Sequence, residues 1–227
     1  MLEIRGLDAW YGRAQIVSGL SFRVRPGEVV AVLGRNGAGK TTTLKRIVGL
    51  AGGRGGEILF CGERIDRLPP YRIARLGLGY VPEDRRIFTD LTVRENLEVG
   101  RQGPRPGVPH WTESKLFDLF TSLERLGERR GGRISGGEQQ MLAIARTLIG
   151  NPRAVLLDEP AEGLAPLVVE QMARTILALK AEGLAVLLCE QNLRFARRVA
   201  DRALLLEQGR LRGSGTMVEI EKEYARL

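Results

Sequence analysis

Continuous apolar runs alternate with helical patterns over much of the chain. "EVVAVLG" (28–34), "AVLLD" (154–158) and "LAVLLCE" (184–190) are apolar at successive positions rather than at every second one. This pattern is typical of parallel strands that are buried on both faces. Between the last two runs, "PLVVEQMARTILALKAEG" has Pro166 at a first helical turn and Gly183 as a stop signal, which predicts a helix. Strands that alternate with helices indicate an α/β core.

Two further parts of the chain have other patterns. The early segments "LEIRGLDAWY", "LSFRVR" and "GEILFCGERI" resemble antiparallel strands. Residues 88–150 carry apolar residues at helical spacing and no strand pattern, which predicts a helical subdomain inserted into the α/β core. We therefore predict a single domain over 1–227, in which 1–87 and 151–227 form the core and 88–150 the insertion.

Composition places the chain among folded proteins. Its 227 residues are 43% hydrophobic and 27% charged, enough for a sizeable core and unlike a disordered chain. No apolar run approaches the roughly 18 residues of a membrane span, and "MLEIRGLDAW" has no signal-peptide pattern. Cys61 and Cys189 lie in apolar runs, so we expect reduced core thiols and a cytoplasmic location. The single histidine, His110, cannot build a metal cluster, and we expect it in a surface loop.

The net charge is 35 − 27 = +8, and 30 of the 35 basic residues are arginine. Such a charge invites a nucleic-acid interpretation. The arginines are scattered, however, and no basic helix interleaved with aromatic residues is present in the sequence. We favour a solvated basic surface that suits an anionic ligand or a membrane face, and we expect no nucleic-acid partner.

One motif carries specific chemistry. "GRNGAGKTT" at 34–42 matches G-x-x-x-x-G-K-[ST], with a predicted strand before it and a helix after it. Glycines let backbone N–H groups converge on phosphates, Lys40 reaches the β- and γ-phosphates, and Thr41 offers a hydroxyl to Mg²⁺. The predicted nucleotide-binding residues of this cradle are Gly34, Asn36, Gly37, Ala38, Gly39, Lys40, Thr41 and Thr42.

"AVLLDEP" supplies carboxylates that complement the cradle. A buried strand that ends in Asp158 places one carboxylate beside the metal, and Glu159 can face the attacking water. Adjacent acids with separate roles suit hydrolysis, because one holds charge while the other positions or deprotonates water. Together with the cradle, these acids indicate an ATPase that uses ATP and Mg²⁺.

A second helix start, in "ISGGEQQ", is also suited to an anion but lacks a lysine. In the order 34–42, 134–140 and 154–160, the chain resembles the ATP-binding-cassette (ABC) ATPases over essentially its whole length. The resemblance implies a P-loop NTPase fold with a mostly parallel core sheet, an antiparallel β subdomain and an inserted α-helical subdomain.

In that family two ATPase domains pair head to tail, and each signature helix closes over the ATP of the other domain. The resemblance therefore implies that Ser135, Gly136, Gly137 and Glu138 act on the ATP of the partner. Ser135 and Gly137 would bind the γ-phosphate. The missing lysine would come from the partner's cradle.

Other site residues follow from the same resemblance. Tyr11 matches the aromatic residue that stacks on adenine, although neighbouring Trp10 and a plain core aromatic are alternatives. Glu83 stands where many relatives have a glutamine, in a loop that senses the γ-phosphate and touches the membrane partner, and we include it among the metal-site residues. The segment 161–166 would line the dimer interface, with Ala165 in place of the more usual aspartate.

Gln191 is the most consequential departure from the family pattern. It follows the run "LAVLLCE", where most relatives have a histidine that contacts the γ-phosphate. Glutamine is neutral and still donates a hydrogen bond. We therefore expect Gln191 to act in catalysis with weaker transition-state stabilisation.

The segments "YVPEDRRIFTDLTVRENL", "DEPAEGLAP" and "EQN" are similar to the LivF-type ATPase subunit of branched-chain amino-acid importers. This implies a second, different ATPase as partner, two transmembrane permease subunits, and indirectly a periplasmic substrate-binding protein, at the inner face of the membrane. Urea or amide importers, a lipopolysaccharide exporter and a non-transport cassette protein remain as alternatives. The other subunits select the substrate, so the sequence of this chain does not identify it.

Overall fold

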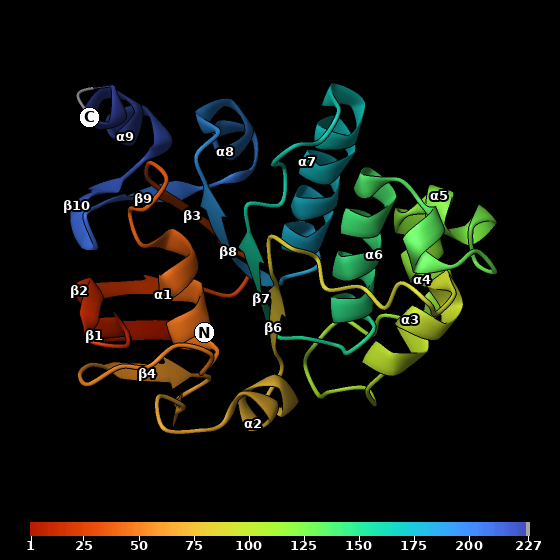
Figure 1. Cartoon of the computed structure of the whole chain (residues 1–227), viewed down its shortest axis with the longest axis horizontal. Coiled ribbons are helices and arrows are strands. Elements are labelled where there is room, and N and C mark those ends of the chain that lie inside the picture. Colours follow the sequence, from red (N-terminus) through yellow and green to blue (C-terminus); the bar gives the residue numbers. More distant parts are fainter. Residues whose placement is uncertain (226–227) are drawn as a thin grey trace.

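The fold contains two β-sheets with helices between and around them (Figure 1). The computed structural model describes residues 1–225. The first sheet is antiparallel and has the order β2-β1-β4-β5, as the three early segments predict. Its strands are β1 (Leu2–Tyr11), β2 (Ala14–Val24), β4 (Glu57–Phe60) and β5 (Glu63–Arg64).

The second sheet is the core sheet, with the order β10-β9-β3-β8-β7-β6. All neighbouring pairs in it are parallel except β9 and β10. The three continuous apolar runs are its central strands β3, β8 and β7, and every residue in them is buried, as predicted. The strands are β3 (Val29–Leu33), β6 (Leu78–Val81), β7 (Ala154–Asp158), β8 (Ala185–Glu190), β9 (Arg202–Glu207) and β10 (Arg210–Gly215).

Helix α1 (Lys40–Ile47) lies between the two sheets and shares one apolar cluster with both of them. In β3, β6, β7, β8 and β9, alternate residues point into this cluster, and the remaining ones point to the other face. That other face is covered by α7 (Pro166–Ala181), α8 (Leu193–Val199) and α9 (Met217–Tyr224), while the short α2 (Pro70–Arg75) precedes β6. The core sheet is therefore covered on both faces, which holds the ends of its strands in fixed positions.

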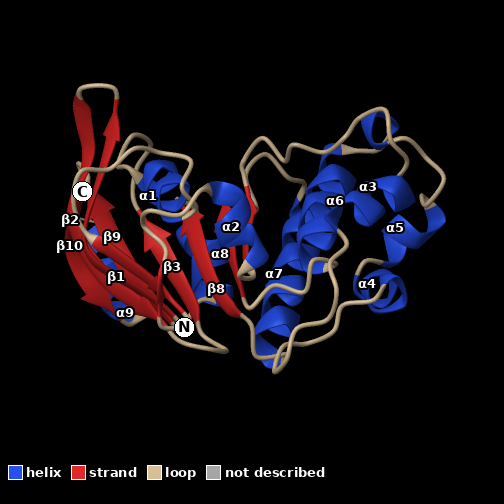
Figure 2. Ribbon diagram, turned by 90° about the horizontal axis from the view of Figure 1, so that it is seen from below, coloured by secondary structure: helices blue, strands red, loops and turns tan. Residues whose placement is uncertain are grey.

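The helices predicted between residues 88 and 150 are present and gather at the β6 side of the core sheet (Figure 1), on the side of the molecule opposite β1 and β2 (Figure 2). Thr92 and Ser135 begin two of them with reciprocal capping boxes. We propose that residues 88–150 form an inserted subdomain. The elements are α3 (Val93–Gly100), α4 (Glu113–Leu119), α5 (Thr121–Arg125), the 3₁₀ turn η1 (Gly131–Arg133) and α6 (Gly136–Leu148).

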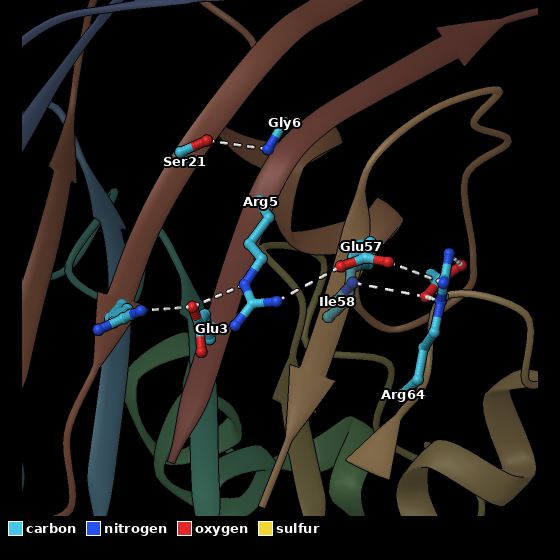
Figure 3. A network of polar contacts seen from close by, with 9 residues as sticks. Glu3, Arg5, Gly6, Ser21, Glu57, Ile58 and Arg64 are labelled. Carbon is cyan, nitrogen blue, oxygen red and sulfur yellow. Dashed lines mark hydrogen bonds and ion pairs between the residues drawn. The ribbon is translucent and has the colours of Figure 1, made fainter. Parts of the chain in front are cut away.

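Charged side chains link the strands of the antiparallel sheet on its exposed face (Figure 3). Arg5 donates to Glu3 at 2.7 Å and lies 3.5 Å from Glu57 on the neighbouring strand. Arg64 in turn donates to Glu57 at 2.8 Å. Because exposed pairs contribute little to stability, we assign this network to strand register rather than to the free energy of folding.

Some features differ from the sequence prediction. Cys61 is exposed, not a core thiol, because it lies in the turn between β4 and β5 with φ 52° rather than in a strand. Cys189 is buried and His110 is exposed in a loop, as expected. The sequence analysis did not predict β6, β9, β10, α2, α8 or α9. Within residues 1–225 no helix is both long and apolar enough to cross a membrane.

Candidate nucleotide-binding site

The loop 34–39 joins β3 to α1 at the carboxyl edge of the core sheet. Gly39 is the N-cap of α1 with φ 104°, and a Cβ at this position would lie 3.2 Å from a methyl carbon of Val17. Only glycine meets both conditions without strain. No side chain caps this helix start among the described residues, so its first N–H groups are free to bind an anion.

Lys40 is buried at the start of α1, with only 4% of its surface exposed. Its ammonium donates to the Gly34 carbonyl at 2.9 Å and to the Arg35 carbonyl at 3.3 Å. It also forms an ion pair with Glu159 Oε1 at 3.1 Å. The lysine predicted to hold phosphates is therefore held by its own loop and by the carboxylate predicted to activate water.

Thr41 and Asp158 lie side by side at the position predicted for the metal. Thr41 Oγ1 donates to Asp158 Oδ1 at 2.9 Å, and the hydroxyl of Tyr80 donates to Asp158 Oδ2 at 3.0 Å. Burial raises the pKa of Asp158, and the two hydroxyl hydrogen bonds oppose that rise. Hydroxyl and carboxylate oxygens are the ligands that Mg²⁺ prefers, so this donor set fits the expected ion.

Glu159 and Gln191 lie at the ends of the adjacent strands β7 and β8. Gln191 Nε2 donates to Glu159 Oε2 at 3.2 Å, while Glu159 Oε1 faces Lys40. Glu159 has a positive φ of 47°, which is unusual for a residue other than glycine. The glutamine that replaces the family's histidine thus contacts the predicted catalytic carboxylate directly.

Glu190 is a buried acid that the sequence analysis missed. Its Oε1 accepts from the Ala161 N–H at 3.2 Å, and its Oε2 accepts from the N–H groups of Gln191 and Asn192 at 3.2 and 3.3 Å. Burial raises the pKa of Glu190 to about 7, although these hydrogen bonds act in the opposite direction. This carboxyl joins the loop after Glu159 to the loop that carries Gln191. The signal in the sequence was an acid at the last position of an apolar strand.

A cavity of about 470 Å³ opens over the cradle. Tyr11, half-exposed at the end of β1, lies in its wall and also lines a neighbouring hollow. Trp10 lines the neighbouring hollow but not the cavity over the cradle, and Arg54 lies 5.2 Å from the centroid of its ring. The geometry therefore favours Tyr11 over Trp10 as the adenine-stacking residue. Glu83 lies in the same wall, and so does Glu162, which the sequence analysis did not single out. The wall consists of Tyr11, Ile16, Asn36, Gly37, Gly39, Lys40, Thr41, Thr42, Glu83, Glu159 and Glu162.

The second helix start lies apart from this cavity. Ser135 is exposed at the start of α6, and its hydroxyl accepts from the Glu138 N–H while the Glu138 carboxylate accepts from the Ser135 N–H. A Cβ on Gly137 would lie 2.9 Å from a methyl carbon of Val168 in α7, so glycine is required for this packing. Within residues 1–225, none of the positions 135–138 lines the cavity over the cradle.

Helix α6 is nevertheless connected to the loop that follows Glu83. The guanidinium of Arg146 donates to the carbonyl oxygens of Arg85 and Arg86 at 3.3 and 2.6 Å. Arg85 also donates to Gln139 at 3.4 Å. These hydrogen bonds join the loop after Glu83 to the helix that starts at Ser135.

Comparison with known proteins decides the family. The model of the ABC transporter family matches residues 17–162, well over half of the chain. The chain belongs to the ABC transporter family. It is the ATP-hydrolysing subunit of such a transporter, a class of ATPases that dimerise and act with transmembrane permease subunits. A solved structure of an ATP-binding subunit of an ABC transporter superposes with a TM-score of 0.83 at 30% identity, over 99% of this chain and 93% of that one.

Three curated relatives are informative. The branched-chain amino acid transport ATP-binding protein BraG of Pseudomonas aeruginosa is 42% identical over 93% of this chain and 91% of its own length. A LivF protein of Archaeoglobus fulgidus, named for the same transport, is 36% identical over 97% and 92%. The lipopolysaccharide export ATP-binding protein LptB of Haemophilus influenzae is 35% identical over 97% and 92%.

The raised pKa of Glu190 predicts a pH-dependent stability. Below about pH 4.5 the Glu190 carboxyl is protonated in both the folded and the unfolded chain, and its contribution to the free energy of unfolding is fully present. Between about pH 4.5 and 7 this carboxyl ionises in the unfolded chain but stays protonated in the folded chain, so the contribution is lost. The unfolding free energy of the wild type, relative to Glu190→Gln, should therefore fall by about 3 kcal/mol across this range. Urea titrations at several pH values measure it.

Glu63→Gln is the matched control, because Glu63 is an exposed glutamate on β5. The same titrations of this variant give the baseline for the comparison. If the Glu190→Gln difference does not change with pH relative to this baseline, burial does not govern the ionisation of Glu190.

If the Tyr11 ring stacks on adenine, Tyr11→Ala should weaken ATP binding by about 1–3 kcal/mol. Calorimetric titration of the purified chain with ATP measures this. Trp10→Ala is the control, since Trp10 faces the other hollow, and it should leave the affinity unchanged. The reverse result, a loss with Trp10→Ala alone, would move the stacking role to Trp10.

Proposed function

We propose that this chain is the energy-coupling ATPase of an importer for branched-chain or other hydrophobic amino acids, bound to the cytoplasmic face of the membrane. Its similarity to BraG, at 42% identity over nearly the full length of both chains, supports this substrate class. The observation that carries the proposal is one complete phosphate cradle together with a second helix start that lies outside its cavity. This arrangement suits a head-to-tail pair, in which the second start serves another cradle.

Each group in the cradle has a distinct task in hydrolysis. The N–H groups at the start of α1 and the ammonium of Lys40 bind the phosphates of ATP. Thr41 and Asp158 would hold Mg²⁺, and we assign Glu83 to the same site. Bound Mg²⁺ supplies positive charge that neutralises the phosphate oxygens.

Glu159 is the general base, because its carboxylate faces the cavity beside Lys40. Once phosphate oxygens replace Glu159 as the partner of the Lys40 ammonium, Glu159 Oε1 is free to accept a proton from water. Gln191 holds the other oxygen and so orients the carboxylate. Unlike an imidazole, its amide carries no charge to the γ-phosphate, which fits a slower step at this site.

The partner is a second, different ABC ATPase. In the head-to-tail pair, Ser135, Gly136, Gly137 and Glu138 act on the ATP of that partner, and the loop 161–166 lies at the interface. Ser135 is exposed and therefore accessible to a partner's nucleotide. Two permease subunits carry the pathway through the membrane, and a periplasmic binding protein delivers the substrate.

A lipopolysaccharide exporter ATPase is the second candidate, favoured by the 35% identity to LptB over most of both chains. The two candidates differ in what stimulates hydrolysis. An importer ATPase responds to a loaded binding protein on the outside, whereas an exporter ATPase responds to lipid within the membrane.

We predict that leucine-loaded binding protein stimulates ATP hydrolysis by the complex reconstituted with its permease subunits. Glu159→Gln in this chain should bind ATP at least as tightly as the wild type, because the phosphate ligands remain and the carboxylate that competes for Lys40 is gone, but turnover at its own site should be abolished, because the water loses its base. Stimulation by lipopolysaccharide instead of the binding protein would support the exporter. Normal turnover by Glu159→Gln would remove Glu159 from the catalytic role.

A further inference from the structure

Both oxygens of the Asp158 carboxylate are held by hydroxyl groups from different elements. Thr41, in α1, donates to Oδ1 at 2.9 Å. Tyr80, in β6, donates to Oδ2 at 3.0 Å. A carboxylate that is held at both oxygens cannot rotate freely about its terminal bond. The hydroxyl of Tyr80 therefore helps to fix the plane of the carboxylate relative to Thr41.

The position of Tyr80 is fixed by the sheet rather than by a loop. Strand β6 pairs in parallel with β7, and Tyr80 lies opposite Leu156, two residues before Asp158. Its ring is half-buried and packs against the apolar cluster between the two sheets. The phenol hydroxyl is a hydrogen-bond donor at physiological pH.

We propose that Tyr80 is a positioning residue for the magnesium site, which orients Asp158 so that one carboxylate oxygen lies beside the Thr41 hydroxyl. Side chains that hydrogen-bond a metal ligand fix its orientation, and their loss weakens metal binding. This inference rests on the proposed ATPase function. It adds a residue that contacts neither phosphate nor metal and acts through Asp158.

The chain offers a matched control for this role. The Tyr80 ring lines a groove of about 430 Å³ that shares no lining residue with the cavity over the cradle, and Tyr71 lines the same groove. Tyr71 is 58% exposed, and among the described contacts its hydroxyl has no bond to Asp158. Removing either hydroxyl alters the same groove, but only one of the two changes touches the carboxylate.

The test compares wild type, Tyr80→Phe and Tyr71→Phe as full-length chains. For each chain, the affinity for a non-hydrolysable ATP analogue is measured once in EDTA and once in Mg²⁺. The ratio of the affinity in Mg²⁺ to the affinity in EDTA is the gain in affinity due to the metal. Tyr80→Phe should reduce this gain about tenfold. Tyr71→Phe should keep the wild-type gain, and all three chains should have equal affinity in EDTA.

A second readout is the Mg²⁺ concentration that gives half-maximal ATP hydrolysis, which should rise about tenfold in Tyr80→Phe alone. An unchanged metal gain in Tyr80→Phe overturns the proposal, as does an equal loss in both variants or a loss of affinity in EDTA. In these cases a wild-type chain that still hydrolyses ATP leaves the proposed function intact. A wild type without hydrolysis in the reconstituted complex would instead overturn that function.

Discussion

The buried charge of Lys40 is the constraint on which the site depends. An ammonium removed from water must be compensated, and here two carbonyls of its own loop and the carboxylate of Glu159 compensate it. The pair joins the loop after β3 to the end of β7. It also occupies the oxygen of Glu159 that accepts a proton from water in the proposed mechanism. The groups proposed for catalysis therefore satisfy one another, and phosphate oxygens can replace the carboxylate beside Lys40.

The order of the core strands explains why these groups meet. In a parallel sheet the carboxyl ends of neighbouring strands lie at one edge, where ligands bind. Strands β3, β8 and β7 are adjacent, so the cradle, Gln191 and Glu159 come from three neighbouring ends. Glu190 then fixes the loops after β7 and β8 to each other through backbone N–H groups. The covered faces of the sheet hold these ends still, and Tyr80 extends the same support to Asp158 from the edge strand β6.

Much of this arrangement could be predicted from the sequence, because the central strands are continuous apolar runs and the cradle motif has a fixed backbone geometry. The edge strands were missed: β6 lies in "LGLGYV", where glycines interrupt the apolar pattern, and β10 is largely exposed. Cys61 was misplaced because an apolar run does not reveal where the chain turns. The contacts of Tyr80 and Glu190 join positions far apart in the sequence or run through backbone N–H groups, so no spacing rule predicts them. The role of Ser135 depends on a second chain and stays a prediction.

The central claim is that ATP replaces Glu159 as the partner of Lys40. A crystal structure of the full-length chain with a non-hydrolysable ATP analogue and Mg²⁺ tests it directly. The account predicts that Lys40 Nζ donates to phosphate oxygens and that its distance to the Glu159 carboxylate exceeds the ion-pair limit of about 4 Å. A Lys40–Glu159 pair that remains at 3.1 Å with nucleotide bound would contradict the account.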